Sequence, residues 1–205
     1  MTDTKKKIIR AAEELFFEFG IANVRLQQIA DKVGISVGNL AYHYKNKEII
    51  VESVYQQVLK ELSEVLSSYL VYPDLSDFDK QFSDLYRFLH DNAFCVNNLW
   101  EIERTYPHLK EDWTRLVNKL QIQIRQRILY HAQRGVIRQE SYRGEHELLT
   151  QAIYLTINFW TSQQLLRGNP IEERMFKKAL WALIYPHLSP EGKLEYAYRI
   201  EPFLI

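Results

Sequence analysis

The side chains best suited to chemistry in this sequence lie between residues 25 and 47, and their chemistry is hydrogen bonding rather than catalysis. One group is consecutive and would open a helix: Ser36, Val37, Gly38 and Asn39. The amide of Asn39 can pair with the edge of an adenine, and Val37 can contact the methyl group of a thymine. A helix that begins here would present these groups to the major groove of DNA.

Further polar residues flank this group. Gln27 and Gln28 can reach bases or phosphates, whereas Tyr42 and His43 lie one turn further along and are better placed for the DNA backbone. Lys47 begins the next predicted helix, where the ammonium group and the helix N-terminus both attract an anion. The sequence therefore predicts that Lys47 clamps a phosphate.

A helix-turn-helix would position these side chains. Apolar spacing predicts helices over about 5–19, 26–33 and 37–44, with Gly34 in the turn and Ser36 as the N-cap of the third helix. Gly34 accepts the positive φ that such a turn needs. Asn46 can cap a long helix that reaches about residue 69.

The remaining chain also has a helical pattern. We predict helices at about 76–92, 94–104, 109–134, 145–167 and 171–185, with a short one after Pro190, and no strands. The fold class is therefore all-α, with a DNA-binding domain at residues 1–46 and a helical bundle for ligand binding and dimerisation at residues 47–205.

Within residues 7–47 and just after them, a set of residues recurs at fixed spacing: Ala11, Ala12, Leu15, Phe16, Phe19, Gly20, Ile29, Ala30, Val33, Gly34, Ile35, Ser36, Gly38, Asn39, Leu40, Tyr42, His43, Tyr44, Asn46, Lys47 and Glu48. Through these residues, the segment resembles the TetR (tetracycline repressor) family of transcriptional regulators. The resemblance implies a two-fold homodimer that binds a palindromic double-stranded operator. It also implies an effector cavity near the middle helices.

Two positions depart from the family pattern. Arg25 stands where the family usually has Thr or Ser, and although it can reach a phosphate, its guanidinium group cannot accept a capping hydrogen bond. Ala41 stands where the family often has an aromatic residue that contacts phosphate. These differences affect single contacts and not the motif.

Composition narrows the classes of function. Lys+Arg and Asp+Glu both number 26, so nucleic-acid binding must depend on a local patch; residues 1–50 hold eight basic and six acidic side chains. A lone cysteine, Cys95, and no signal-peptide pattern suggest a cytoplasmic protein without a membrane partner. The histidines lack metal-ligand spacing, and no nucleophile or phosphate-loop motif occurs. We therefore expect no metal, no cofactor and no enzyme activity.

The last two long helices are the candidates for dimerisation, because each is apolar on two sides. In the first of them, Leu149 and Phe159 lie on one side, and Leu148, Leu155 and Leu166 on the other. Burial of both sides within one core is the alternative. Four aromatic residues near Pro107 could line a pocket for a small apolar or aromatic effector, or could simply fill the core: Phe94, Trp100, Tyr106 and Trp113.

The sequence thus predicts a repressor that a small organic ligand releases from its operator. A ligand-independent regulator or an activator is the alternative within the same class. An enzyme and a purely structural helical protein are the alternatives from other classes.

Overall fold

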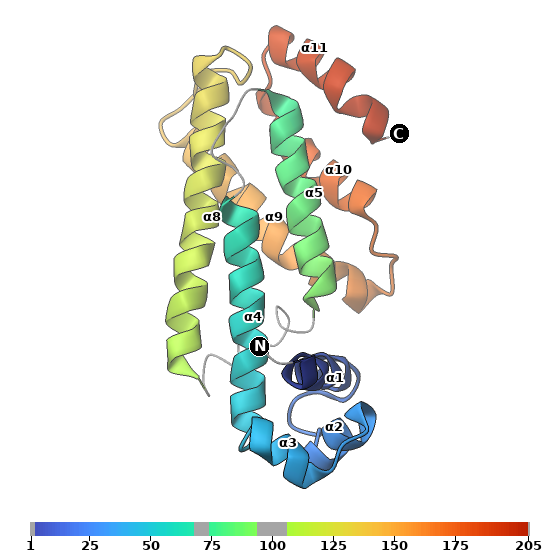
Figure 1. Cartoon of the computed structure of the whole chain (residues 1–205). Helices are drawn as coiled ribbons and strands as arrows, with labels where there is room; N and C mark the ends of the chain where they lie inside the picture. Colours follow the sequence, from blue (N-terminus) through green and yellow to red (C-terminus); the bar gives the residue numbers. More distant parts are fainter. Residues whose placement is uncertain (1–2, 68–73, 94–105, 205) are drawn as a thin grey trace. The chain divides into compact units, whose positions relative to one another are not determined.

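The computed structural model describes residues 3–67, 74–93 and 106–204, and these residues confirm the all-α prediction (Figure 1). Their α-helices are α1 (Asp3–Phe19), α2 (Leu26–Val33), α3 (Val37–His43), α4 (Lys47–Ser67), α5 (Leu75–Asp91), α8 (Pro107–Gln133), α9 (Glu145–Arg167), α10 (Glu173–Ile184) and α11 (Pro190–Arg199). The short 3-10 helices η1 (Tyr185–His187) and η2 (Glu201–Phe203) were not predicted. Phe94, Cys95, Trp100 and the predicted helix 94–104 lie outside the described residues.

The chain divides into two compact units. The first consists of Met1–Glu61 and Phe94–Trp113, and the second of Leu62–Ala93 and Thr114–Ile205. Helix α4 begins in the first unit and ends in the second, and α8 does the same. The predicted functional division at residues 46 and 47 remains a prediction.

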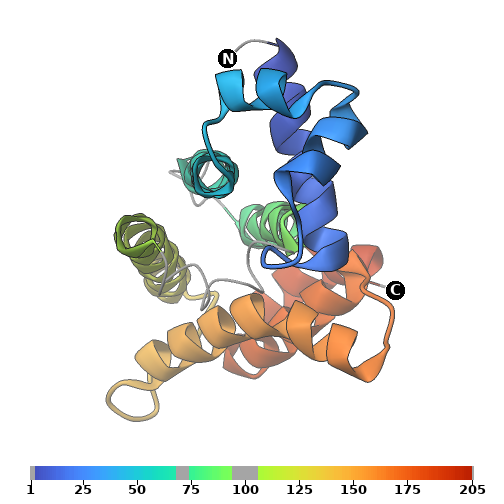
Figure 2. The ribbon, with the colours of Figure 1, turned by 90° about the horizontal axis from the view of Figure 1, so that it is seen from below.

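In the first unit, α1 packs on α2 and α2 packs on α3 (Figure 2). Ile8, Phe16, Ile29 and Leu40 are each no more than 1% exposed, so a small core fixes the angles between these helices. Gly34 ends α2 with φ 76°, which only glycine adopts without strain. Ser36 Oγ accepts a hydrogen bond from the backbone N–H of Asn39 at 3.1 Å, so the predicted N-cap of α3 is confirmed.

Helix α4 begins where the sequence predicts. Asn46 Oδ1 accepts a hydrogen bond from the backbone N–H of Ile49 at 3.0 Å, and Glu48 lies in the first turn. Tyr44, just before this start, is 5% exposed and packs in the core. Burial of Tyr44 therefore stabilises the end of α3, and the Asn46 cap stabilises the start of α4.

The second unit is a helical bundle in which α10 packs on α5 and α9. Phe78 and Phe82 of α5 meet Trp181 of α10 edge to face, and Trp181 Nε1 donates to Asp79 at 2.9 Å. Lys177 pairs with the same carboxylate at 2.6 Å. An aromatic cluster and an ion pair therefore both hold α10 against α5.

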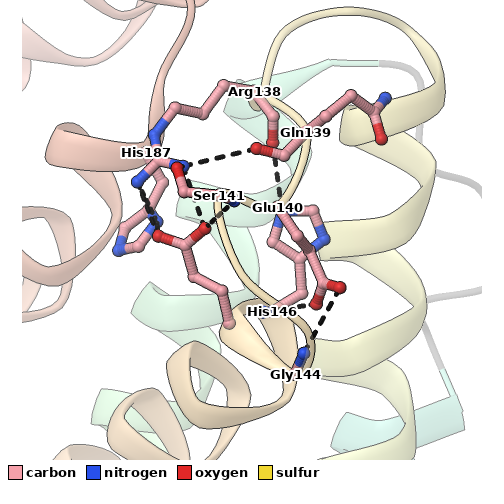
Figure 3. Close-up of polar contacts among 8 residues, drawn as sticks. Arg138, Gln139, Glu140, Ser141, Gly144, His146 and His187 are labelled. Atoms are coloured by element: carbon pink, nitrogen blue, oxygen red, sulfur yellow. Dashed lines mark hydrogen bonds and ion pairs between the residues drawn. The ribbon is translucent and has the colours of Figure 1, made fainter.

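A polar cluster fastens the loop between α8 and α9 (Figure 3). Arg138 binds both carboxylate oxygens of Glu145, at 2.9 and 2.6 Å, and the backbone N–H of Ser141 donates to the same carboxylate at 2.6 Å. The Arg138 guanidinium, followed by the Ser141 N–H, lowers the pKa of Glu145 to about 2. Nearby, Glu140 accepts from the backbone N–H of His146 at 2.9 Å. These contacts set the first turn of α9.

Candidate nucleic-acid interface

The candidate interface begins at the N-terminus of α2, where the polar side chains are exposed but have local partners. Gln28 Oε1 accepts a hydrogen bond from the backbone N–H of Arg25 at 2.7 Å, so glutamine caps the helix that the Arg25 side chain cannot cap. Gln27 Nε2 donates to Asp31 at 2.7 Å on the same helix. Both side-chain amides therefore have intramolecular hydrogen-bond partners in the protein without DNA.

Helix α3 presents the predicted recognition residues on one side and anchors itself with the other. Leu40 is fully buried, whereas Gly38 and Asn39 are exposed and Tyr42 is 85% exposed. Val37 and His43 are half-buried, and the His43 ring meets that of Tyr42 edge to face. The buried leucine thus orients α3 so that the Asn39 amide and the Tyr42 hydroxyl face away from the core.

The three consecutive lysines near the N-terminus, Lys5, Lys6 and Lys7, have different surroundings. Lys5 lies over the ring of Tyr44, with Nζ 5.6 Å from the ring centroid, and Lys7 pairs with Asp3 at 2.8 Å. The hydrogen bond from Lys7 lowers the pKa of Asp3, as expected for such a pair. Lys6 is exposed on the helix surface.

Lys47 has contacts that the sequence did not predict. Its ammonium group donates to the carbonyl oxygens of Ile21 at 2.9 Å, Ala22 at 3.4 Å and Val24 at 3.0 Å. These carbonyls belong to the segment between α1 and α2, and the side chain of Lys47 is half-buried against it. A phosphate contact by Lys47 therefore stays a prediction, whereas its contacts with these three carbonyls are observed.

In the second unit, polar side chains line the inward face of α8. Gln123, Arg127 and His131 are spaced four residues apart and are all buried. Gln123 bonds to Gln81 of α5, and Arg127 Nη1 pairs with Asp77 Oδ2 at 2.6 Å. This row was missed because its histidine was considered only as a metal ligand. The helical spacing of its three members would have been the signal.

His131 Nε2 in this row and Gln81 Oε1 on the facing helix α5 have no hydrogen-bond partner among the described residues. The guanidinium group of Arg134 lies 3.1 Å from His131 Nδ1, and because arginine only donates, Nδ1 accepts and Nε2 carries the proton of the neutral ring. The contact between α5 and α8 therefore offers one acceptor, Gln81 Oε1, and one donor, His131 Nε2, that water or a polar ligand can satisfy.

His131 makes the stability of the protein depend on pH. Burial, followed by repulsion from Arg134 and Arg127, lowers the pKa of His131 to about 4. The unfolded chain binds this proton near pH 6.5, so the stabilisation is complete above that value and is lost as the pH falls towards 4. We expect this histidine to account for a loss of up to about 3 kcal/mol in the free energy of unfolding.

Urea unfolding at about pH 7 and about pH 4.5 measures this effect. The loss on acidification is expected to shrink in His131→Phe but to stay unchanged in His90→Phe, which removes an exposed imidazole. An equal loss in wild type and His131→Phe would contradict the assignment.

The predicted effector residues are only partly described. Tyr106 and Trp113 are both half-buried and belong to the first unit, whereas Phe94 and Trp100 lie outside the described residues. Burial, and then the charges of Glu48 and Glu52, raise the pKa of Tyr106. Among the described residues no cluster of three or more potential metal ligands occurs, and no described helix has the length and apolarity needed to span a membrane.

Comparison with known proteins agrees with this geometry. Residues 8–54 match the family model of bacterial regulatory proteins of the tetR family, and residues 51–196 match the TetR model described as a bacterial transcriptional repressor. The HTH-type transcriptional regulator RutR of Escherichia coli K12 is 42% identical over 55 residues, 27% of this chain and 26% of RutR. BetI of Stenotrophomonas maltophilia is 31% identical over 65 residues, 32% of this chain and 33% of BetI. The chain therefore matches only about a quarter to a third of the length of these relatives.

Solved structures resemble nearly the whole chain. A TetR-family transcriptional regulator from Marinobacter aquaeolei VT8 has a TM-score of 0.82 at 23% identity and covers 98% of both chains. The SmeT–triclosan complex has a TM-score of 0.62 at 17% identity and covers 93% of this chain and 94% of SmeT. At these identities the likeness establishes the fold.

A capped recognition helix on a small helical core, joined to a larger helical bundle, defines the class of helix-turn-helix DNA-binding regulators. Since one family model alone matches residues 51–196, more than half of the sequence, the chain belongs to the TetR family of bacterial regulatory proteins. The members of this family that it resembles are transcriptional regulators and not enzymes, in agreement with the sequence.

Proposed function

We propose that this protein is a repressor that binds a palindromic operator as a homodimer and releases it when a small organic effector binds. The observation that carries the DNA-binding part is the orientation of α3, in which buried Leu40 turns Asn39 and Tyr42 outward. The proposed contact residues are Arg25, Gln27, Gln28, Ser36, Val37, Gly38, Asn39, Tyr42 and His43.

Asn39 tests base reading directly. In Asn39→Ala we expect a loss of about 1–3 kcal/mol of discrimination at one base pair in each half-site, because a bidentate pair with adenine is removed. The measurement is binding to an operator selected from random-sequence DNA and to its single-base variants.

The neighbouring Tyr42→Phe serves as the control, since its hydroxyl is proposed to contact the DNA backbone. It should weaken binding to all of these sequences by a similar factor. If Asn39→Ala also weakened every sequence equally, Asn39 would be a backbone contact and the assignment would be wrong.

The second copy in the proposed homodimer would cover an apolar stripe on α9. Leu148, Leu155, Phe159 and Leu166 recur at helical spacing and are 52–81% exposed in the single chain, whereas Leu149, Ile153 and Ile157 on the other side are buried. The expectation that Phe159 lies on the side of Leu149 was wrong, because its spacing of four residues from Leu155 places it with the exposed leucines. An exposed stripe of this size is unfavourable in water unless a partner covers it. A homodimer also supplies the two recognition helices that a palindrome requires.

The proposed effector acts through α4, which is continuous between the two units. A ligand shifts an equilibrium only by binding one state better than the other. Tilting of α4 would change the spacing of two recognition helices that must lie about 34–36 Å apart on DNA. SmeT, whose structure resembles this fold, was solved in complex with triclosan, and this complex supports the proposal of a small-molecule effector here.

A screen of small aromatic compounds for release of the selected operator tests the effector. The proposed lining is Phe94, Trp100, Tyr106 and Trp113. A compound that releases the operator from wild type should act less well on Trp113→Ala, while both proteins bind DNA equally in its absence. If compounds that bind the protein leave its affinity for the operator unchanged, the regulator is independent of ligand. If they increase that affinity, the effector promotes operator binding and the proposed release is wrong.

A further inference from the structure

The ammonium group of Lys47 already has a complete set of acceptors in the free protein. A lysine ammonium has three N–H donors, and three carbonyl oxygens lie within 2.9–3.4 Å of Nζ. The three carbonyls come from Ile21, Ala22 and Val24, which are 23 to 26 residues earlier in the chain. A phosphate oxygen would have to replace one of them.

The three carbonyls belong to the segment that determines the direction of α2, the first helix of the helix-turn-helix. Gly20 ends α1, and Arg25 is the N-cap of α2, so the segment 21–24 fixes the direction in which α2 leaves. Val24 is 1% exposed, which anchors the segment from the core side. Lys47 is the first residue of α4, so its side chain links the start of α4 to the segment that leads into α2.

We propose that Lys47 supports operator binding as a positioning residue, which holds the segment between α1 and α2 against the start of α4, and not as a phosphate contact. The inference rests on the proposed function for its DNA readout but makes a separate statement about the free protein. It also connects α4 to the segment that leads into α2, in addition to the connection of α4 through the chain to α3.

Arginine and methionine at this position separate the two roles. Lys47→Arg keeps the charge and binds phosphate well, but a planar guanidinium fork cannot direct three donors from one nitrogen at three carbonyls. Lys47→Met keeps the length and loses the charge. Lys45→Met is the control, because Lys45 is an exposed lysine two residues earlier.

The first measurement is affinity for the selected operator over a series of salt concentrations. We expect Lys47→Met and Lys47→Arg each to bind about tenfold more weakly than wild type, which is the effect of losing charge-assisted hydrogen bonds worth about 1.5 kcal/mol. The dependence of log K on log salt is expected to keep the wild-type slope in both variants. If Lys47→Arg binds like wild type while Lys47→Met loses about 0.9 from the slope, Lys47 contacts a phosphate and the proposal is wrong.

The second measurement needs no DNA. Amide hydrogen exchange at residues 21–26 of the free protein is expected to be faster in both Lys47 variants than in wild type and Lys45→Met, while the amides of α9 keep their protection. Unchanged exchange at residues 21–26 would overturn the positioning role. Failure of wild type to select any DNA would instead overturn the proposed function, and the exchange result would still decide the role of Lys47 in the loop.

Discussion

Leu155→Arg is expected to convert the proposed homodimer to a monomer and to weaken operator binding by about 100- to 10,000-fold, because two linked recognition helices gain that much over one. Leu155 is 52% exposed at the centre of the stripe formed by Leu148, Leu155, Phe159 and Leu166. An arginine there costs little in the isolated chain but places a charge in the proposed interface. Solution mass and operator affinity are the two measurements.

Leu194→Arg is the matched control. Leu194 is a leucine of α11 that is 63% exposed, and the same substitution there should leave both mass and affinity unchanged. A Leu155→Arg protein that remains dimeric and binds DNA normally would contradict the assignment of the α9 stripe to the dimer.

Asp77→Ala is expected to lower the free energy of unfolding by about 3–5 kcal/mol, because it removes the carboxylate partner of a buried guanidinium group. The Arg127 side chain is fully buried and its Nη1 lies 2.6 Å from Asp77 Oδ2. The same guanidinium group lies over the ring of Phe78, 5.6 Å from its centroid, so it has little room to turn towards solvent. Urea unfolding at neutral pH measures the change.

The double variant Asp77→Ala/Arg127→Met tests the cause. With both charges gone, no unpaired charge stays buried in the site, and stability should return to within about 1–2 kcal/mol of wild type. Together with the two single variants, the double variant gives the coupling energy between Asp77 and Arg127. A double variant less stable than Asp77→Ala would show that Arg127 stabilises the bundle through its packing and not through this pair.

The elements of this fold were predictable from local sequence alone. Predicted helix bounds such as 26–33 and 145–167 coincide with α2 and α9, because glycine and apolar spacing act within one or two turns. The caps at Ser36 and Asn46 are equally local. The short helices η1 and η2 follow no apolar period and were missed.

The candidate site was predictable in its members but not in all of its contacts. Burial of Leu40 fixes which side of α3 faces the core, and Asn39 and Tyr42 lie on the exposed side. Gln28 was expected to reach DNA, yet in the free protein its side chain caps α2. Gln28 makes this bond because an amide oxygen accepts hydrogen bonds, which a guanidinium group does not.

The sequence by itself determined which segments are helical, where they are capped and which family they belong to, since each of these depends on neighbours within a few residues or on a motif read along the chain. The tertiary structure alone decided which polar groups meet. Lys47 finds its carbonyl partners 23 to 26 residues away, and Arg127 finds Asp77 50 residues away. Gly192 lies where a Cβ would come within 2.1 Å of the Val136 carbonyl oxygen, a close approach between distant segments. Such contacts depend on how whole helices pack, and helical periodicity carries no information about a partner on another helix.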